Sequence, residues 1–64
     1  MKVFLHTKEI EIEDVKSTKE LIDVLKLVTN TVLVLKNGQI VEVADRERIK
    51  SSDKLEVVKV ISGG

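Results

Sequence analysis

The sequence contains no cysteine, no proline, no tryptophan and no tyrosine, and it has a single phenylalanine and a single histidine. Without cysteine there is no disulfide framework, no thiolate nucleophile and no thiolate zinc site. The one histidine, His6, cannot form a histidine metal cluster, so the sequence predicts no metal site. The stability of the fold must therefore come from aliphatic side chains.

Net charge is absent as well, because 11 Lys and Arg residues balance 11 Asp and Glu residues. A nucleic-acid binder needs a surplus of cations to displace phosphate counterions, and a polybasic membrane-surface module needs a similar surplus. No apolar run approaches the ~18 residues of a transmembrane helix. The apolar run at the start of the chain is too short for a signal peptide. The sequence thus predicts a cytoplasmic protein with no direct binding to nucleic acid or membranes.

The 64 residues are 42% apolar and 34% charged, which is the composition of one small globular domain. A domain of this size has little volume for a deep substrate pocket, which typically needs ~300 Å³ or more. Composition therefore disfavours a self-contained enzyme. We expect a monomer.

The chain begins with two segments of alternating polarity. Residues 2–6 predict a first strand, and residues 9–13 alternate strictly between Glu and Ile, which is typical of a half-buried strand. The short connection Thr7-Lys8 suggests an antiparallel hairpin, although it lacks the Gly or Asn that a tight primed turn prefers.

The hydrophobic period then changes from that of a strand to that of a helix. Ser17 and Glu20 match a capping box at a helix start. Leu21, Leu25 and Val28 follow at helical spacing, which predicts an amphipathic helix that ends near Thr29-Asn30, with Asn30 as a left-handed cap.

The rest of the chain contains three further strand signals. Residues 32–35 are apolar and rich in β-branched side chains, and Asn37-Gly38 is a strong signal for a primed hairpin turn into a return strand over 39–43. Residues 44–53 predict a polar loop with a short helical turn, pinned by Ile49. A last strand is expected over 54–60.

The predicted order is β-β-α-β-β-β, an α+β domain. One helix can cover only one face of a sheet, so we expect a mixed sheet of four to five strands with the helix packed across one face. The first and last strands can then pair in parallel at the centre. Residues 1–60 form the predicted domain, and residues 61–64 form a flexible diglycine tail.

The order of elements, the Lys36-Asn37-Gly38-Gln39 hairpin and the terminal Gly63-Gly64 together resemble the ubiquitin-like β-grasp fold. Within it the chain resembles the small sulfur-carrier branch that contains ThiS, MoaD, bacterial TtuB and the archaeal small modifier proteins. The resemblance covers the whole chain.

The resemblance implies that the protein acts through its C-terminus. An E1-like adenylating enzyme would activate the Gly64 carboxylate with ATP, and sulfur would then displace AMP to leave a thiocarboxylate. Gly63 and Gly64 lack a Cβ, so such a tail can thread a narrow channel and approach the nucleotide closely. The carrier would bind no cofactor itself, because ATP and Mg²⁺ would be bound by the partner enzyme. A sulfurtransferase or other sulfur donor, and a downstream thiolation enzyme or thiazole synthase, would complete the pathway.

The acceptor of the sulfur is the open question. The ending Ile61-Ser62-Gly63-Gly64 looks closest to the TtuB type, so the first expectation is sulfur donation for 2-thiouridine in tRNA. Sulfur donation for the thiazole of thiamine is the second, and molybdopterin synthesis is the third. The activated acyl group could instead be captured by target lysines as an isopeptide, and a plain β-grasp interaction domain is a further alternative.

A docking patch for the activating enzyme is expected beside the tail. If Leu55 and Val57 point into the core, Val58 and Val60 share the outward face of Glu56. We expect Val58, Val60, Ile61 and an outward Val34 on the neighbouring strand to contribute to this patch. The alternatives are that Val58 lies under a loop, or that Val34 belongs to the core and Leu33 does not.

Overall fold

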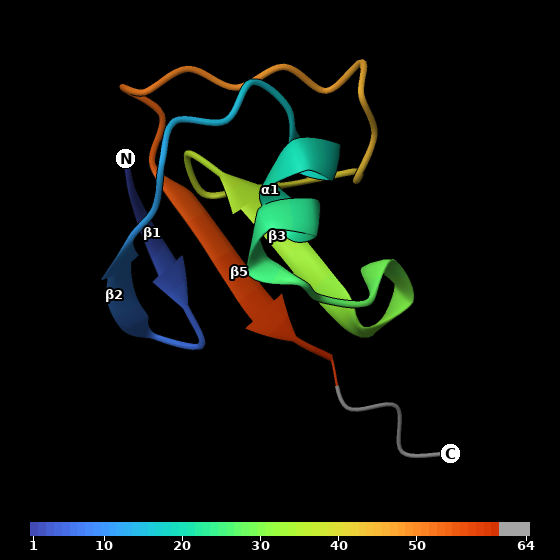
Figure 1. The fold of residues 1–64 in the computed structure, drawn as a ribbon. Coiled ribbons are helices and arrows are strands. Elements are labelled where there is room, and N and C mark those ends of the chain that lie inside the picture. The colour runs from blue at the N-terminus through green and yellow to red at the C-terminus, as the bar shows by residue number, and fades with distance from the viewer. Residues whose placement is uncertain (61–64) are drawn as a thin grey trace.

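A computed structural model describes residues 1–60 as a single mixed β-sheet with one α-helix packed across one face (Figure 1). The sheet order is β2-β1-β5-β3-β4, so the last strand lies in the middle of the sheet. The elements, in chain order, are β1 (Lys2–Leu5), β2 (Lys8–Glu11), α1 (Thr18–Leu25), the 3-10 turn η1 (Thr29–Thr31), β3 (Val32–Lys36), β4 (Gln39–Val41) and β5 (Leu55–Lys59).

Strand β5 joins two antiparallel hairpins into one sheet. It pairs in parallel with β1 and antiparallel with β3, while β1 pairs with β2 and β3 pairs with β4. The expected β-β-α-β-β-β order, the five-stranded mixed sheet and the central parallel pair are confirmed. Neither helical segment within residues 1–60 is long and apolar enough to span a lipid bilayer.

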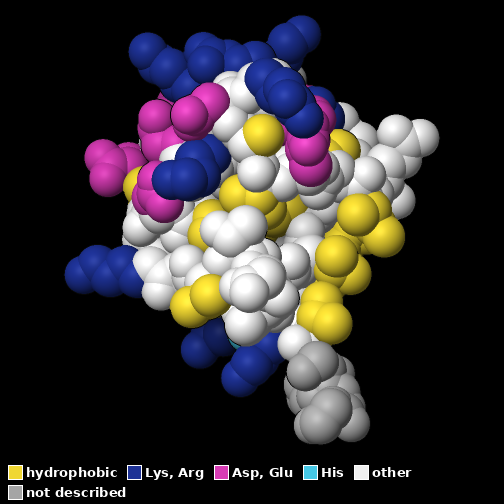
Figure 2. Space-filling view, turned by 90° about the vertical axis from the view of Figure 1, so that its right-hand side faces the viewer, with side chains coloured by type: hydrophobic (Ala, Val, Ile, Leu, Met, Phe, Trp, Pro, Cys, Tyr) yellow, Lys and Arg dark blue, Asp and Glu magenta, His cyan; other side chains and the backbone are white. Residues whose placement is uncertain are grey.

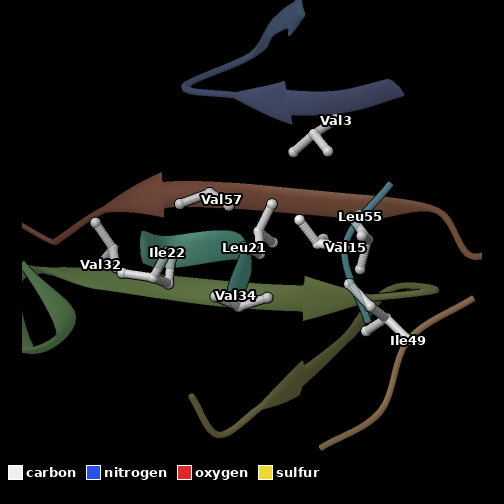
Figure 3. Close-up of a cluster of buried hydrophobic side chains, with 9 residues drawn as sticks. All are labelled: Val3, Val15, Leu21, Ile22, Val32, Val34, Ile49, Leu55 and Val57. Carbon is white, nitrogen blue, oxygen red and sulfur yellow. The ribbon is translucent and has the colours of Figure 1, made fainter. Parts of the chain in front are cut away.

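The core lies between the sheet and the helix and is made only of aliphatic side chains (Figure 3). Alternate residues of the central strands point into it, as the period of two in a strand requires. Burying each of these side chains contributes about 1.5–3 kcal/mol to stability, before the entropy cost of folding. The nine buried residues are Val3, Val15, Leu21, Ile22, Val32, Val34, Ile49, Leu55 and Val57.

Helix α1 begins where the sequence predicts and ends earlier. The Ser17 hydroxyl accepts a hydrogen bond from the Glu20 amide at 3.2 Å, and the Glu20 carboxylate accepts from the Lys16 amide at 3.3 Å. The helix stops at Leu25 because Lys26 takes the left-handed conformation, with φ 58° and its amide bonded to the Asp23 carbonyl. The expectation of Asn30 as the cap is therefore wrong, and Val28 lies outside the helix.

The polar segment before β5 forms no helix, but it contains two hydrogen-bonded turns, over residues 44–47 and 50–53. Ile49 pins the segment to the core, as predicted. Buried Thr18 holds its beginning: the Thr18 hydroxyl donates to the Glu42 carbonyl at 2.8 Å and accepts from the Ala44 amide at 3.0 Å. The loop is thus folded by hydrogen bonds to the start of the helix.

Candidate functional site

The sequence-predicted site lies at the C-terminal end of β5. Its reactive residues, Gly63 and Gly64, and the predicted docking residue Ile61 lie outside the described residues. Val60, which follows β5 directly, is the last residue that the structure describes.

Hydrogen bonds from both neighbouring segments hold this end of β5. The Val60 amide donates to the Thr31 carbonyl at 2.8 Å, just before β3 begins. On the other side the Lys59 amide donates to His6 Nδ1 at 3.1 Å. The chain is therefore fixed on two sides where it leaves the sheet. Sequence reasoning considered His6 only as a metal ligand, and no local signal connects it to a residue 53 positions away.

The face of the sheet that the helix leaves uncovered is apolar next to this end. Figure 2 shows hydrophobic side chains gathered along one side of the molecule, at the right of the view. By strand register the open face of the sheet carries aliphatic and aromatic side chains around Glu56. We call these residues the open-face patch: Phe4, Leu33, Leu35, Ile40, Val58 and Val60.

The open-face patch is accessible to a partner. Ile40 is 65% exposed and Leu33 and Val60 are each 40% exposed, while Val58 is half-buried opposite Leu33. Exposed apolar side chains that lie together are typical of interaction surfaces. The placement of Val58 on the outward face of β5 is confirmed by its pairing with Leu33, while Val60 lies one residue beyond the strand. The role of both residues in docking stays a prediction.

The expected outward placement of Val34 is wrong. Val34 is completely buried, and Leu33 takes the outward position that was expected for Val34. Residues 32–35 are all apolar, so alternation alone does not show whether the even-numbered or the odd-numbered residues face the core. The pairing of Leu33 with Val58 decides it, because directly paired residues share a face of the sheet.

One carboxylate lies within the open-face patch. Glu56 is paired across the strands with Phe4 on one side and Leu35 on the other. Near it the Lys54 ammonium lies 5.9 Å from the centre of the Phe4 ring, at the distance of a cation–π contact. The patch thus combines an apolar surface with the Glu56 carboxylate inside it, and it has the Lys54 ammonium and the Glu9 carboxylate, which is paired with Phe4, at its border.

Two charged residues that follow β4 pair with each other, and a third pairs with a lysine of β3. Arg46 makes two hydrogen bonds to the Glu42 carboxylate, at 2.8 and 3.0 Å, and this pairing raises the pKa of Arg46 and lowers the pKa of Glu42. Lys36 binds the Glu47 carboxylate at 2.9 Å, which raises the pKa of Lys36. Arg46 is therefore already engaged by a carboxylate and does not present an unpaired basic surface.

Neither a pocket nor a metal site in residues 1–60 offers a second candidate for a functional site. A shallow hollow of about 310 Å³ lies at the edge strand β2, lined by Lys2, Glu9, Ile10 and Glu11, at the opposite end of β1 from the end of β5. Among residues 1–60, no three His, Asp or Glu side chains gather as metal ligands would. The candidate site is thus the end of β5 with the adjoining open-face patch.

Comparisons with known proteins show which family the chain belongs to. The ThiS family model matches residues 2–64, which includes both terminal glycines. The fold is similar to a crystal structure of the thiamine biosynthesis protein ThiS from Geobacter metallireducens, with 25% identity, complete coverage of both chains and a TM-score of 0.68. It is also similar to an NMR structure of a thiamine biosynthesis protein from that organism, with 25% identity, a TM-score of 0.67 and coverage of 100% of this chain and 88% of that one. A search among curated proteins gave no match. The chain belongs to the ThiS family of ubiquitin-like sulfur carriers.

Proposed function

We propose that this protein carries sulfur for the thiazole ring of thiamine, as a thiocarboxylate on Gly64. The observation that carries the proposal is the family match through residue 64, which includes Gly63 and Gly64. Both solved relatives are named as thiamine biosynthesis proteins and match this chain over its full length. The tRNA 2-thiouridine role, which the Ile-Ser-Gly-Gly ending favoured, finds no support in these comparisons.

The chemistry is that of a carrier, with the catalytic groups on its partners. The Gly64 carboxylate attacks the α-phosphorus of ATP, which forms an acyl-adenylate and releases pyrophosphate. Hydrosulfide then adds to the acyl carbon and expels AMP, which leaves the thiocarboxylate. Where a sulfurtransferase presents the sulfur as a persulfide, the same attack gives an acyl disulfide, and a second thiol cleaves it to the thiocarboxylate and is itself left in a disulfide. A free carboxylate is a poor electrophile, so adenylation is needed to give the acyl carbon a good leaving group. The protein is a co-substrate of its E1-like adenylating enzyme and is not itself an enzyme.

The decisive experiment is the intact mass of the protein after incubation with the adenylating enzyme of its host, ATP and sulfide. We expect a gain in mass equal to sulfur replacing one oxygen, and no gain when Gly64 is deleted. An unchanged mass together with no trapped acyl-adenylate would contradict the proposal.

The acceptor is tested separately in cells. Deletion of the gene should create a requirement for thiamine and leave the 2-thiouridine content of tRNA unchanged. The opposite pattern would assign the protein to tRNA thiolation. Gly-Gly remnants on lysines of other proteins that disappear with the deletion would instead support the protein-modifier alternative.

We further propose that the open-face patch docks on the adenylating enzyme. Leu33→Glu places a charge at an exposed position of the patch, and we expect KM for adenylation to rise about tenfold, which corresponds to about 1.4 kcal/mol of docking free energy. Val58→Glu should also raise KM for adenylation. Val24→Glu is the matched control, because Val24 is 36% exposed on the helix side of the molecule. Equal KM values for Leu33→Glu and Val24→Glu would contradict docking through this face.

A further inference from the structure

The parallel pairing of β1 with β5 ends in an unusual way. The His6 amide donates to the Val57 carbonyl at 2.9 Å, as a regular parallel ladder requires. In such a ladder the next hydrogen bond runs from the amide two residues further along β5, that of Lys59, to the carbonyl of His6. The main chain of His6 does not make this bond.

The reason is that the chain turns at His6. His6 and Thr7 both have positive φ, 52° and 70°, and form the tight turn into β2. The His6 carbonyl accepts from the Thr7 hydroxyl instead. The Lys59 amide donates to His6 Nδ1 at 3.1 Å, so the imidazole takes the place of the missing carbonyl acceptor. The side chain of His6 thus extends the ladder by one hydrogen bond after its main chain has left it.

This hydrogen bond acts where the functional segment begins. Lys59 pairs with Val32 on the β3 side, and the Val60 amide binds the Thr31 carbonyl. On the β1 side, the His6 imidazole accepts the corresponding hydrogen bond from the Lys59 amide. The four Cα–Cα steps from Val60 to Gly64 span at most about 14 Å. The direction of the chain at Lys59 and Val60 therefore sets which region the Gly64 carboxylate can reach.

We infer that His6 is a positioning residue for adenylation, whose Nδ1 holds the Lys59 amide and so directs the chain that carries Gly63 and Gly64 toward the nucleotide. This inference rests on the proposed function. Misplacing a reacting group by about 1 Å can cost about a hundredfold in rate, so a loosened attachment should lower the rate of the chemical step. Docking through the open-face patch should be unaffected.

Two variants separate the hydrogen bond from the backbone conformation. His6→Gly accommodates the positive φ without strain but has no acceptor. His6→Asn also tolerates the left-handed region and offers a carbonyl oxygen close to the position of Nδ1. We expect His6→Gly to lower kcat for acyl-adenylate formation about tenfold with KM within twofold of the wild type. His6→Asn should keep kcat within twofold. In the free protein, amide hydrogen exchange at Lys59 should accelerate in His6→Gly and stay slow in His6→Asn.

The outcomes distinguish this inference from the function on which it rests. A wild-type kcat in His6→Gly, or an equal loss of kcat in His6→Asn, would overturn the positioning role while the carrier function stands. A rise in KM with unchanged kcat would also overturn it, because that result assigns His6 to docking. A wild-type protein that is never adenylated would overturn the proposed function and this inference together.

Discussion

The two hairpin turns of this protein perform related tasks with different residues. Asn37-Gly38 joins β3 to β4, and His6-Thr7 joins β1 to β2; all four residues have positive φ. In each turn the side chain of the first residue accepts a hydrogen bond from an amide that borders β5. Asn37 Oδ1 binds the Lys54 amide at 2.9 Å, before β5 begins, and His6 Nδ1 binds the Lys59 amide at its end.

The difference between the turns lies in how well their residues suit the backbone. Asn and Gly adopt positive φ at little cost, so the β3–β4 turn agrees with its own sequence. Thr is β-branched, and positive φ is an outlier for such a residue. The β1–β2 turn is therefore imposed by strand pairing and by the contact of His6 with β5. Strained backbone that persists in a fold is often found beside functional segments, and here it lies beside the end of β5.

The largest effect on stability is expected from Asn37→Ala in the turn that suits its residues. The change places Ala at φ 53° and removes the acceptor for Lys54 and the 3.1 Å hydrogen bond to Asp53. We expect the free energy of unfolding in urea to fall by about 2 kcal/mol. Asn37→Gly is the control, because it keeps the conformation and loses only the hydrogen bonds, and it should lose about half as much. Equal losses would assign the whole effect to the hydrogen bonds.

A smaller effect of opposite sign is expected from Thr7→Gly in the strained turn. Gly removes the β-branched side chain at φ 70°, and it also removes the hydroxyl that binds the His6 carbonyl. We expect a net gain of about 0.5 kcal/mol, reduced by the greater freedom of Gly in the unfolded chain, and a rise in Tm of about 2–4 °C. Thermal unfolding followed by circular dichroism measures it. A lower Tm would mean that the hydroxyl contact outweighs the strain.

The smallest effect concerns pH. The Lys50 amide and the Asn37 side chain bind the Asp53 carboxylate and lower its pKa in the folded protein. A lowered folded pKa means that this stabilisation is present above the ordinary carboxyl pKa and is lost as the pH falls through the folded value. Asp53→Asn should therefore unfold more easily than the wild type at neutral pH, and the difference should shrink as the pH falls below the ordinary carboxyl pKa. A difference that is constant with pH would show that the charge of Asp53 contributes nothing.

Local signals predicted the parts of the fold that local chemistry determines. Asn37-Gly38 marked its hairpin, and Ser17 marked the start of α1, because each supplies the conformation or hydrogen bond that its position needs. Alternation placed Leu55 and Val57 in the core. The open-face patch was half predicted, since Val58 was placed correctly and Val34 was not.

The remaining features depend on contacts between distant residues. Pairing with β5 determines which of residues 32–35 face the core. The helix ends at Leu25 because Lys26 takes the left-handed conformation, which lysine does not favour. His6 and Lys59 meet only because β1 and β5 are neighbours in the sheet. A single sequence carries no signal for a hydrogen bond between two such positions.

The central place of β5 has a consequence for folding. The β1–β2 and β3–β4 hairpins are local structures, but β1 and β3 become neighbours of a common strand only when β5 inserts between them. A chain stopped before residue 55 would keep two unpaired strand edges, which are sites for aggregation. Closure of the sheet and formation of the base from which residues 61–64 extend are thus one cooperative event. Quality control that removes unfolded copies of this protein would therefore also remove copies in which no ordered strand precedes the terminal glycines.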